Sequence, residues 1–219
     1  ALLRETFFLM GVNLILVFHT AFNLPTDTID SILCNEYRIR RFISEYAYSE
    51  GSERTFLLSR VKSKWIGSGH ITEKFEEKFR IYKNSKYALS VNSCTAALHL
   101  SLIYSGIKRN DEVITTPMTF ASTINSIILA GAKPVLADID EETFNIDPKK
   151  IEEKITKKTK GIIVVHLAGL PCKIESINRI RKKHNLFLIE DCAHSIESKY
   201  NNIPLGNFGS TGCFSFYST

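Results

Sequence analysis

Residues 185–195 read Asn-Leu-Phe-Leu-Ile-Glu-Asp-Cys-Ala-His-Ser, an apolar run that ends in two adjacent carboxylates with a histidine three residues after the second. An unbroken apolar run such as Leu186–Ile189 is typical of a parallel strand that is covered on both faces. Open parallel sheets bind their ligands just beyond the carboxyl ends of their strands. Asp191 and His194 therefore stand where the sequence predicts a ligand site. A second interpretation stays open, in which Glu190 and Asp191 are loop residues that cap the element that follows.

Strand and helix patterns alternate along the rest of the chain. Short apolar runs predict strands at 87–91, 112–115, 134–138, 161–165 and 211–217. Periodic segments predict a helix that starts at Thr72 and helices over 92–100, 121–130 and 174–184. A further helix is predicted to begin at Asp147-Pro148, with Ile151 and Ile155 one turn apart. Residues 199–202 are predicted to form a polar turn. Such alternation with short connections predicts an α/β fold with a mainly parallel sheet.

The segment at 87–100 predicts a strand that runs directly into a helix through Ser and Thr residues. The first amide N–H groups of a helix have no internal partner, so a phosphate group can accept hydrogen bonds from them and from the Thr95 hydroxyl. The sequence therefore predicts an anion site here. The alternative is an ordinary Ser/Thr helix cap without a ligand.

The composition is that of an ordinary globular protein, with 219 residues, 44% hydrophobic and 23% charged. The net charge of +5 includes no basic block interleaved with aromatic residues, so we expect no nucleic-acid partner. The five cysteines include no Cys-x-x-Cys pair, which favours neither a disulfide framework nor a metal site. A reducing compartment, the cytoplasm, is the expected location.

The N-terminal segment differs from the remainder. Thr6–Phe22 is a 17-residue apolar stretch, at the lower limit of length for a membrane span. A signal peptide and a segment foreign to the domain are the other interpretations. We expect residues 1–55 to be a separate segment and residues 56–219 to be one partial domain, with membrane attachment the less favoured outcome.

Six segments together resemble the DegT/StrS family of sugar aminotransferases, which are pyridoxal-phosphate enzymes of fold type I. The motifs are Trp-Ile-Gly-Ser-Gly at 65–69, Asn-Ser-Cys-Thr-Ala-Ala-Leu-His-Leu at 92–100, Asp-Glu-Val-Ile-Thr-Thr-Pro-Met-Thr-Phe at 111–120, Gly-Ala-Lys-Pro-Val at 131–135, Ile-Glu-Asp-Cys-Ala-His at 189–194 and Cys-Phe-Ser-Phe-Tyr-Ser-Thr at 213–219. The resemblance implies a three-layer α/β/α architecture, the large cofactor domain of such an enzyme.

The resemblance also assigns site residues, and pyridoxal 5'-phosphate is the implied cofactor. Asp191 would pair with the pyridinium nitrogen, so that the protonated ring acts as the electron sink. The other implied cofactor contacts are Cys94, Thr95 and Ser215 at the phosphate, Phe120 and Ala193 on the two faces of the ring, and His194 at the ring hydroxyl. Cys94 stands where many family members have glycine.

In the family, the Schiff-base lysine follows the motif that here ends at Thr219, so we expect a fragment that is inactive alone. The resemblance implies transfer of an amino group from an amino acid to a nucleotide-linked keto sugar, in the biosynthesis of polysaccharide or of secondary-metabolite sugars, by a homodimer. Two alternatives stay open. One is a sugar dehydratase of the same fold with histidine in place of that lysine, and the other is a non-catalytic cofactor-binding or interaction protein.

Overall fold

A computed structural model of the chain describes residues 70–216. The predicted segment 1–55, the apolar stretch 6–22, the motif at 65–69 and the last three residues of the motif at 213–219 lie outside the described residues. Within the described part, Glu77–Phe216 form one compact unit, and the fold below is that of this unit.

Five parallel strands form the sheet, in the spatial order β2-β1-β3-β4-β7. The strands are β1 (Glu112–Thr115), β2 (Lys133–Leu136), β3 (Thr159–Val165), β4 (Phe187–Asp191) and β7 (Thr211–Cys213). The chain adds β2 on one side of β1 and then β3 on the other, so the order reverses between β1 and β3. Such a switch point opens a crevice at the carboxyl ends of the strands.

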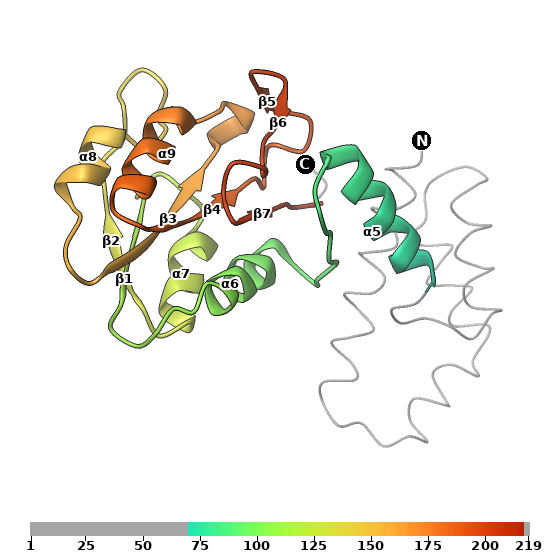
Figure 1. Cartoon of the computed structure of the whole chain (residues 1–219), viewed down its shortest axis with the longest axis horizontal. Helices are drawn as coiled ribbons and strands as arrows, with labels where there is room; N and C mark the ends of the chain where they lie inside the picture. The colour runs from blue at the N-terminus through green and yellow to red at the C-terminus, as the bar shows by residue number, and fades with distance from the viewer. Residues whose placement is uncertain (1–69, 217–219) are drawn as a thin grey trace, which may run out of the picture. The chain divides into compact units, whose positions relative to one another are not determined.

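Helices cover both faces of this sheet, α8 and α9 on one and α6 and α7 on the other (Figure 1). The helices are α5 (His70–Lys83), α6 (Cys94–Tyr104), α7 (Ala121–Leu129), α8 (Pro148–Glu153), the 3-10 turn η1 (Leu167–Gly169) and α9 (Ile174–Lys183). The predicted three-layer α/β/α architecture with a mainly parallel sheet is confirmed.

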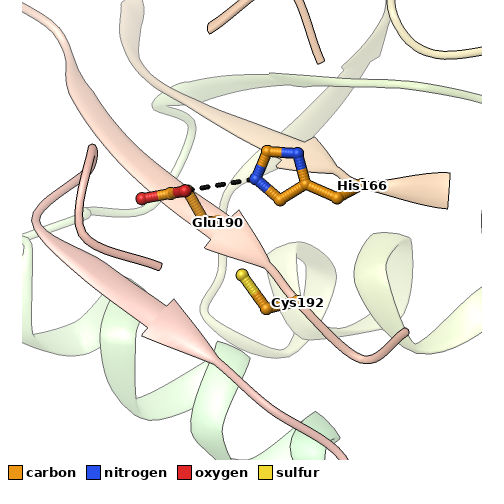
Figure 2. A group of neighbouring side chains, drawn as sticks. All are labelled: His166, Glu190 and Cys192. Carbon is orange, nitrogen blue, oxygen red and sulfur yellow. Dashed lines mark hydrogen bonds and ion pairs between the residues drawn. The ribbon is translucent and has the colours of Figure 1, made fainter. Parts of the chain in front are cut away.

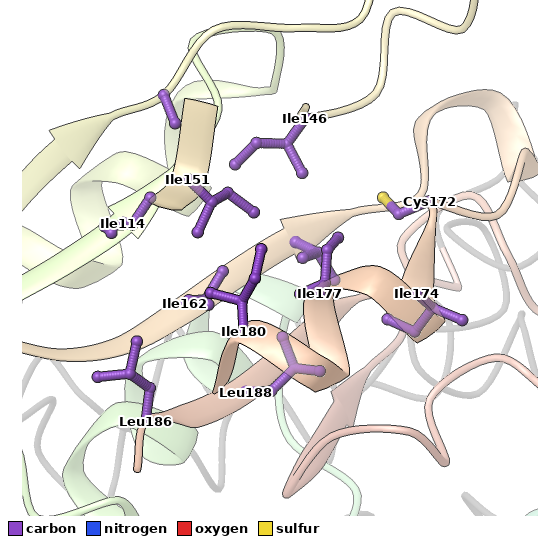
Figure 3. Close-up of a cluster of buried hydrophobic side chains, with 12 residues drawn as sticks. Ile114, Ile146, Ile151, Ile162, Cys172, Ile174, Ile177, Ile180, Leu186 and Leu188 are labelled. Atoms are coloured by element: carbon purple, nitrogen blue, oxygen red, sulfur yellow. The ribbon is translucent and has the colours of Figure 1, made fainter. Parts of the chain in front are cut away.

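Alternate residues of the strands β1, β3 and β4 fill two separate cores. On β4, Leu188 packs on the α8/α9 face with Ile174 and Ile177 of α9 (Figure 3), and the next residue, Ile189, packs on the α6/α7 face with Leu98. All five side chains are fully buried. This two-sided burial explains why the apolar run before Glu190 shows no polar alternation.

Three expectations from the sequence were wrong in detail. Residues 87–91 form no strand, since Tyr87 and Leu89 are exposed and the segment makes no ladder pairing in the described chain. The last strand, β7, ends at Cys213, although alternating aromatic residues continue beyond it. Helix α8 ends at Glu153, so Ile155 packs against the core from outside the helix.

The predicted polar turn is the connection of a two-stranded hairpin, β5 (Lys199–Tyr200) and β6 (Ile203–Pro204). Asn201 and Asn202 both have positive φ, 48° and 65°, the conformation of the tight hairpin turn that asparagine tolerates. No helix within residues 70–216 combines the length and the apolar character that crossing a membrane requires.

Candidate functional site

Asp191 is the last residue of β4, and its side chain points to the α6/α7 face at the carboxyl edge of the sheet. Its Oδ2 accepts a hydrogen bond from the Thr123 hydroxyl of α7 at 2.7 Å. Its Oδ1 accepts one from the Ala193 amide at 3.2 Å and lies 4.0 Å from the Cys94 sulfur. The strand, two helices and the loop after β4 thus meet at one carboxylate.

Burial raises the pKa of Asp191, because only 4% of the residue is exposed and the charged form loses its hydration. The hydrogen bonds from Thr123 and Ala193 and the nearby imidazoles of His194 and His166 act in the opposite direction and offset part of that increase. No lysine or arginine within residues 70–216 forms an ion pair with Asp191. A buried carboxylate without a protein cation suits a cationic group on a ligand.

Helix α6 begins beside this carboxylate. Ser93 is its N-cap, and the Ser93 hydroxyl accepts a hydrogen bond from the Ala96 amide. The amides of Cys94 and Thr95 and the Thr95 hydroxyl make no hydrogen bond within the described chain, so three donors remain for an anion. Burial raises the pKa of the Cys94 thiol, which therefore stays neutral beside Asp191.

The other residues implied by the resemblance lie around this point with different degrees of contact. Phe120 is the N-cap residue of α7, one turn before Thr123, and 81% of the residue is exposed. Ala193 touches Asp191 through its amide and is half-buried. His194 is exposed, and Ser215 lies two residues beyond the end of β7. Direct contacts thus join Cys94, Asp191 and Ala193, and the His194 imidazole is near enough to Asp191 to lower the pKa of that carboxyl.

Thr123 is a site residue that the sequence reasoning missed. It is fully buried in a helix whose other inward residues include Ile127, and its hydroxyl lies 2.8 Å from that of Thr119 as well as donating to Asp191. The available signal was a hydroxyl residue at an inward position of an apolar helix, directly after the Thr-Phe motif at 119–120.

A second buried polar cluster, His166, Glu190 and Cys192, lies on the other side of β4 (Figure 2). Its ligand atoms lie within 4.8 Å of one another, as a metal site requires. However, both carboxylate oxygens of Glu190 already accept backbone hydrogen bonds, and both ring nitrogens of His166 are paired. Burial raises the pKa of Cys192 well above its usual value, so the thiolate that metals bind is disfavoured. The cluster therefore fits a structural network better than a metal site.

Comparison with known proteins connects these features to a family. The model of the DegT/DnrJ/EryC1/StrS aminotransferase family matches residues 49–219. An uncharacterized protein of Methanocaldococcus jannaschii is 52% identical over 163 residues, which are 74% of this chain and 42% of that protein. The GDP-perosamine synthase of Escherichia coli O157:H7 is 43% identical over 168 residues, which are 76% of this chain and 46% of the enzyme.

Solved structures agree with these relatives. The aminotransferase from Psychrobacter cryohalolentis superposes with a TM-score of 0.70 at 39% identity, over 76% of this chain and 43% of that one. A Bacillus subtilis protein, NtdA, solved with bound cofactor PMP, gives a TM-score of 0.60 at 36% identity, over 60% of this chain and 30% of its own.

The chain spans less than half the length of the curated relatives it matches. The match nevertheless covers more than half of the chain itself and includes both the helix start at α6 and the carboxylate at the end of β4. The expected fold type of the sugar aminotransferases is confirmed by the structural similarity. The chain belongs to the DegT/DnrJ/EryC1/StrS aminotransferase family.

Proposed function

We propose that this chain is the cofactor-binding part of a pyridoxal-phosphate-dependent aminotransferase that acts on a nucleotide-linked keto sugar. The observation that carries the proposal is the proximity of a buried carboxylate, Asp191, which forms no ion pair with a lysine or arginine of residues 70–216, to the open amides at the start of α6. The cofactor has a phosphate at one end of its ring system and a pyridine nitrogen at the other. The two features of the site match these two groups.

The phosphate would accept hydrogen bonds from the amides of Cys94 and Thr95 and from the Thr95 hydroxyl, at the positive end of the α6 dipole. The side chain of Cys94, where many members have glycine, leaves these backbone donors in place. We also assign a phosphate contact to Ser215.

The bound cofactor supplies an electron sink for the carbanion that forms when a proton leaves the amino-bearing carbon. Asp191 would keep the ring nitrogen protonated, because an ionised carboxylate stabilises the adjacent pyridinium charge. The Thr123 hydroxyl and the Ala193 amide orient that carboxylate. Phe120 would lie on one face of the ring and Ala193 on the other, and His194 would contact the ring hydroxyl.

The proposed substrate is based on the names of the related enzymes. The most informative name among them is GDP-perosamine synthase, an enzyme whose product is a nucleotide-linked amino sugar. We propose a nucleotide-linked keto sugar as amino acceptor and an amino acid as donor. A role in polysaccharide biosynthesis and a cytoplasmic location complete the proposal, and the four cysteines of the described residues are all free thiols, as a reducing compartment requires.

We further propose that the complete enzyme is a homodimer. Helices α6 and α7 carry several large apolar side chains that are about half or more exposed, namely Leu100, Ile103, Tyr104, Ile128 and Leu129. An apolar surface of this kind on helices beside the site is typical of a face that another subunit covers. Sedimentation of the wild-type chain and of Leu129→Lys, whose side chain is 66% exposed, tests this face, and a dimer only in the wild type is the expected result.

Cofactor binding is the direct test of the proposed function, since it depends on described residues. Titration of the purified chain with pyridoxal phosphate should give saturable binding that Thr95→Ala weakens by about 1.5–3 kcal/mol, the cost of losing a hydrogen bond to a charged group. Thr143→Ala, a threonine in the Asp140 turn that contacts no part of the site, is the control. Equal affinities for all three proteins would contradict the phosphate assignment.

A further inference from the structure

Glu190 precedes Asp191 on β4 and has no role in the chemistry proposed above. Its side chain is completely buried. Oε1 accepts hydrogen bonds from the Phe208 and Gly209 amides, both at 2.7 Å. Oε2 lies 2.9 Å from the Gly206 amide and 3.1 Å from Nε2 of His166 (Figure 2). Burying a carboxylate costs free energy, which these four hydrogen bonds offset. We therefore asked what the buried side chain of Glu190 does.

The protonation state of His166 follows from its second ring nitrogen. Nδ1 accepts a hydrogen bond from the Cys172 amide at 3.1 Å, so it carries no proton. The proton of the neutral ring is then on Nε2, which donates it to Glu190. All four groups that form hydrogen bonds with the Glu190 carboxylate are therefore donors, so both carboxylate oxygens act only as acceptors.

These contacts tie two segments to the end of β4. His166 directly follows β3, and its own amide donates to the Asp191 carbonyl at 3.2 Å. Gly206–Gly209 form the turn that leads into β7 and towards Ser215. This turn lies directly on β4, because a Cβ on Gly209 would come within 2.4 Å of the Leu188 carbonyl oxygen. The network thus joins the ends of β3 and β4 to the start of β7.

Neighbouring residues on a strand point to opposite faces. Glu190 points towards the α9 face with Leu188, and Asp191 points towards α6 and α7 with Ile189. The backbone between the two carboxylates is therefore held from one face while the site is built on the other. A displacement of Glu190 would move Asp191 relative to Thr123, its partner on another element.

We propose that Glu190 is a positioning residue that, through His166 and the 206–209 turn, sets Asp191 at hydrogen-bonding distance from Thr123 and Ala193. The proposal rests on the proposed function for its purpose, but its geometry concerns the chain alone. Glu190→Gln is the informative substitution. In either orientation the amide NH2 would face backbone N–H donors, and His166 cannot rearrange because its Nδ1 is held by Cys172.

The test combines three measurements on the full 219-residue chain. The first is hydrogen exchange at the Phe208 and Gly209 amides, which should accelerate in Glu190→Gln. The second is the titration of the Asp191 carboxyl carbon by NMR. The third is the affinity for pyridoxal phosphate, which should fall by about tenfold or more, as it does for metals when a residue behind a ligand is replaced. Glu197→Gln, the same substitution on the exposed loop nearby, is the matched control.

The direction of the Asp191 titration separates positioning from a charge effect. Loss of a nearby negative charge alone would lower the pKa of Asp191, whereas loss of the hydrogen bonds from Thr123 and Ala193 would raise it. An upward movement is expected in Glu190→Gln and none in Glu197→Gln. Glu190→Asp keeps the charge on a shorter stem, so it should move the titration in the same direction by less. It also provides the measurement if the amide variant does not fold.

A downward or absent movement in the folded variants, with unchanged cofactor affinity, would overturn the positioning role. Failure of the proposed function has a different signature. If the wild-type chain does not bind pyridoxal phosphate, the functional assignment is wrong, while the exchange and titration measurements still decide whether Glu190 holds Asp191 in place.

Discussion

Thr123→Val should increase the proton affinity of Asp191. The substitution keeps the shape of the side chain but removes the hydroxyl that donates to Oδ2 at 2.7 Å. This hydrogen bond lowers the pKa of Asp191 against the larger effect of burial. A hydrogen bond to a charged group contributes about 1.5–3 kcal/mol, and about 1.36 kcal/mol corresponds to a tenfold change, so the proton affinity should rise by about 10- to 100-fold.

The assay is a pH titration of the Asp191 carboxyl carbon by NMR in the empty chain. Thr115→Val is the matched control, because its buried hydroxyl donates to the Ile163 carbonyl at 3.0 Å and not to a carboxylate. The control should titrate as the wild type does. An unchanged or lower midpoint in Thr123→Val would refute the assignment of Thr123 as the residue that stabilises the Asp191 charge.

Three further predictions concern stability. The pKa of Asp191 is raised in the folded state, so its contribution to stability is present below the unfolded carboxyl pKa of about 3.9 and is lost as the pH rises through the folded pKa. Asp191→Asn should remove this loss and melt at or above the wild-type temperature at neutral pH. A clear decrease in the melting temperature would contradict this prediction. Gly209→Ala should destabilise the chain by about 1–3 kcal/mol in urea unfolding, since its Cβ would meet a backbone oxygen, and an unchanged midpoint would show that the turn can move. Leu188→Ala should lower the free energy of unfolding by about 2–5 kcal/mol, whereas Leu100→Ala, at a half-exposed position, should lower it by less than about 0.5 kcal/mol. Equal unfolding midpoints for the two variants would contradict this difference.

Much of the fold could be predicted from local patterns, because the strands β1, β3 and β4 are largely buried on both faces and the helices between the strands are bounded by clear signals. The Asp147-Pro148 pair is one such signal, and the Asp147 side chain does accept a hydrogen bond from the Lys149 amide. The three isoleucines of α9 are buried as their spacing predicted.

Two of the three wrong expectations have a common physical origin in contacts between distant segments. Residues 87–91 have the composition of a strand, but a strand needs a neighbour, and the described chain gives them none. The alternating aromatic residues after Cys213 were interpreted as strand, whereas Phe214 and Phe216 pack edge-on against Phe79 of α5.

The site shows the same division. Local motifs predicted a helix over 92–100, which the structure starts at Cys94, and the carboxylate at Asp191, and the structure brings the side chains of Cys94 and Asp191 together. The partners that orient these residues come from elsewhere in the sequence. Thr123 is 68 positions from Asp191, and His166 is 24 positions from Glu190, so no local pattern links either pair. Their hydrogen bonds exist because the parallel sheet brings the carboxyl ends of β1, β3 and β4, and the segments that follow them, to one edge.

One binding comparison tests directly whether Asp191 pairs with the ring nitrogen of the cofactor. The affinities of the wild-type chain and of Asp191→Asn are measured for pyridoxal phosphate and for its analogue with a carbon atom in place of the ring nitrogen. We expect the wild type to prefer pyridoxal phosphate, and Asp191→Asn to lose this preference while retaining phosphate-dependent binding. A wild-type chain that binds both compounds equally, or a preference that survives in Asp191→Asn, would contradict the assignment.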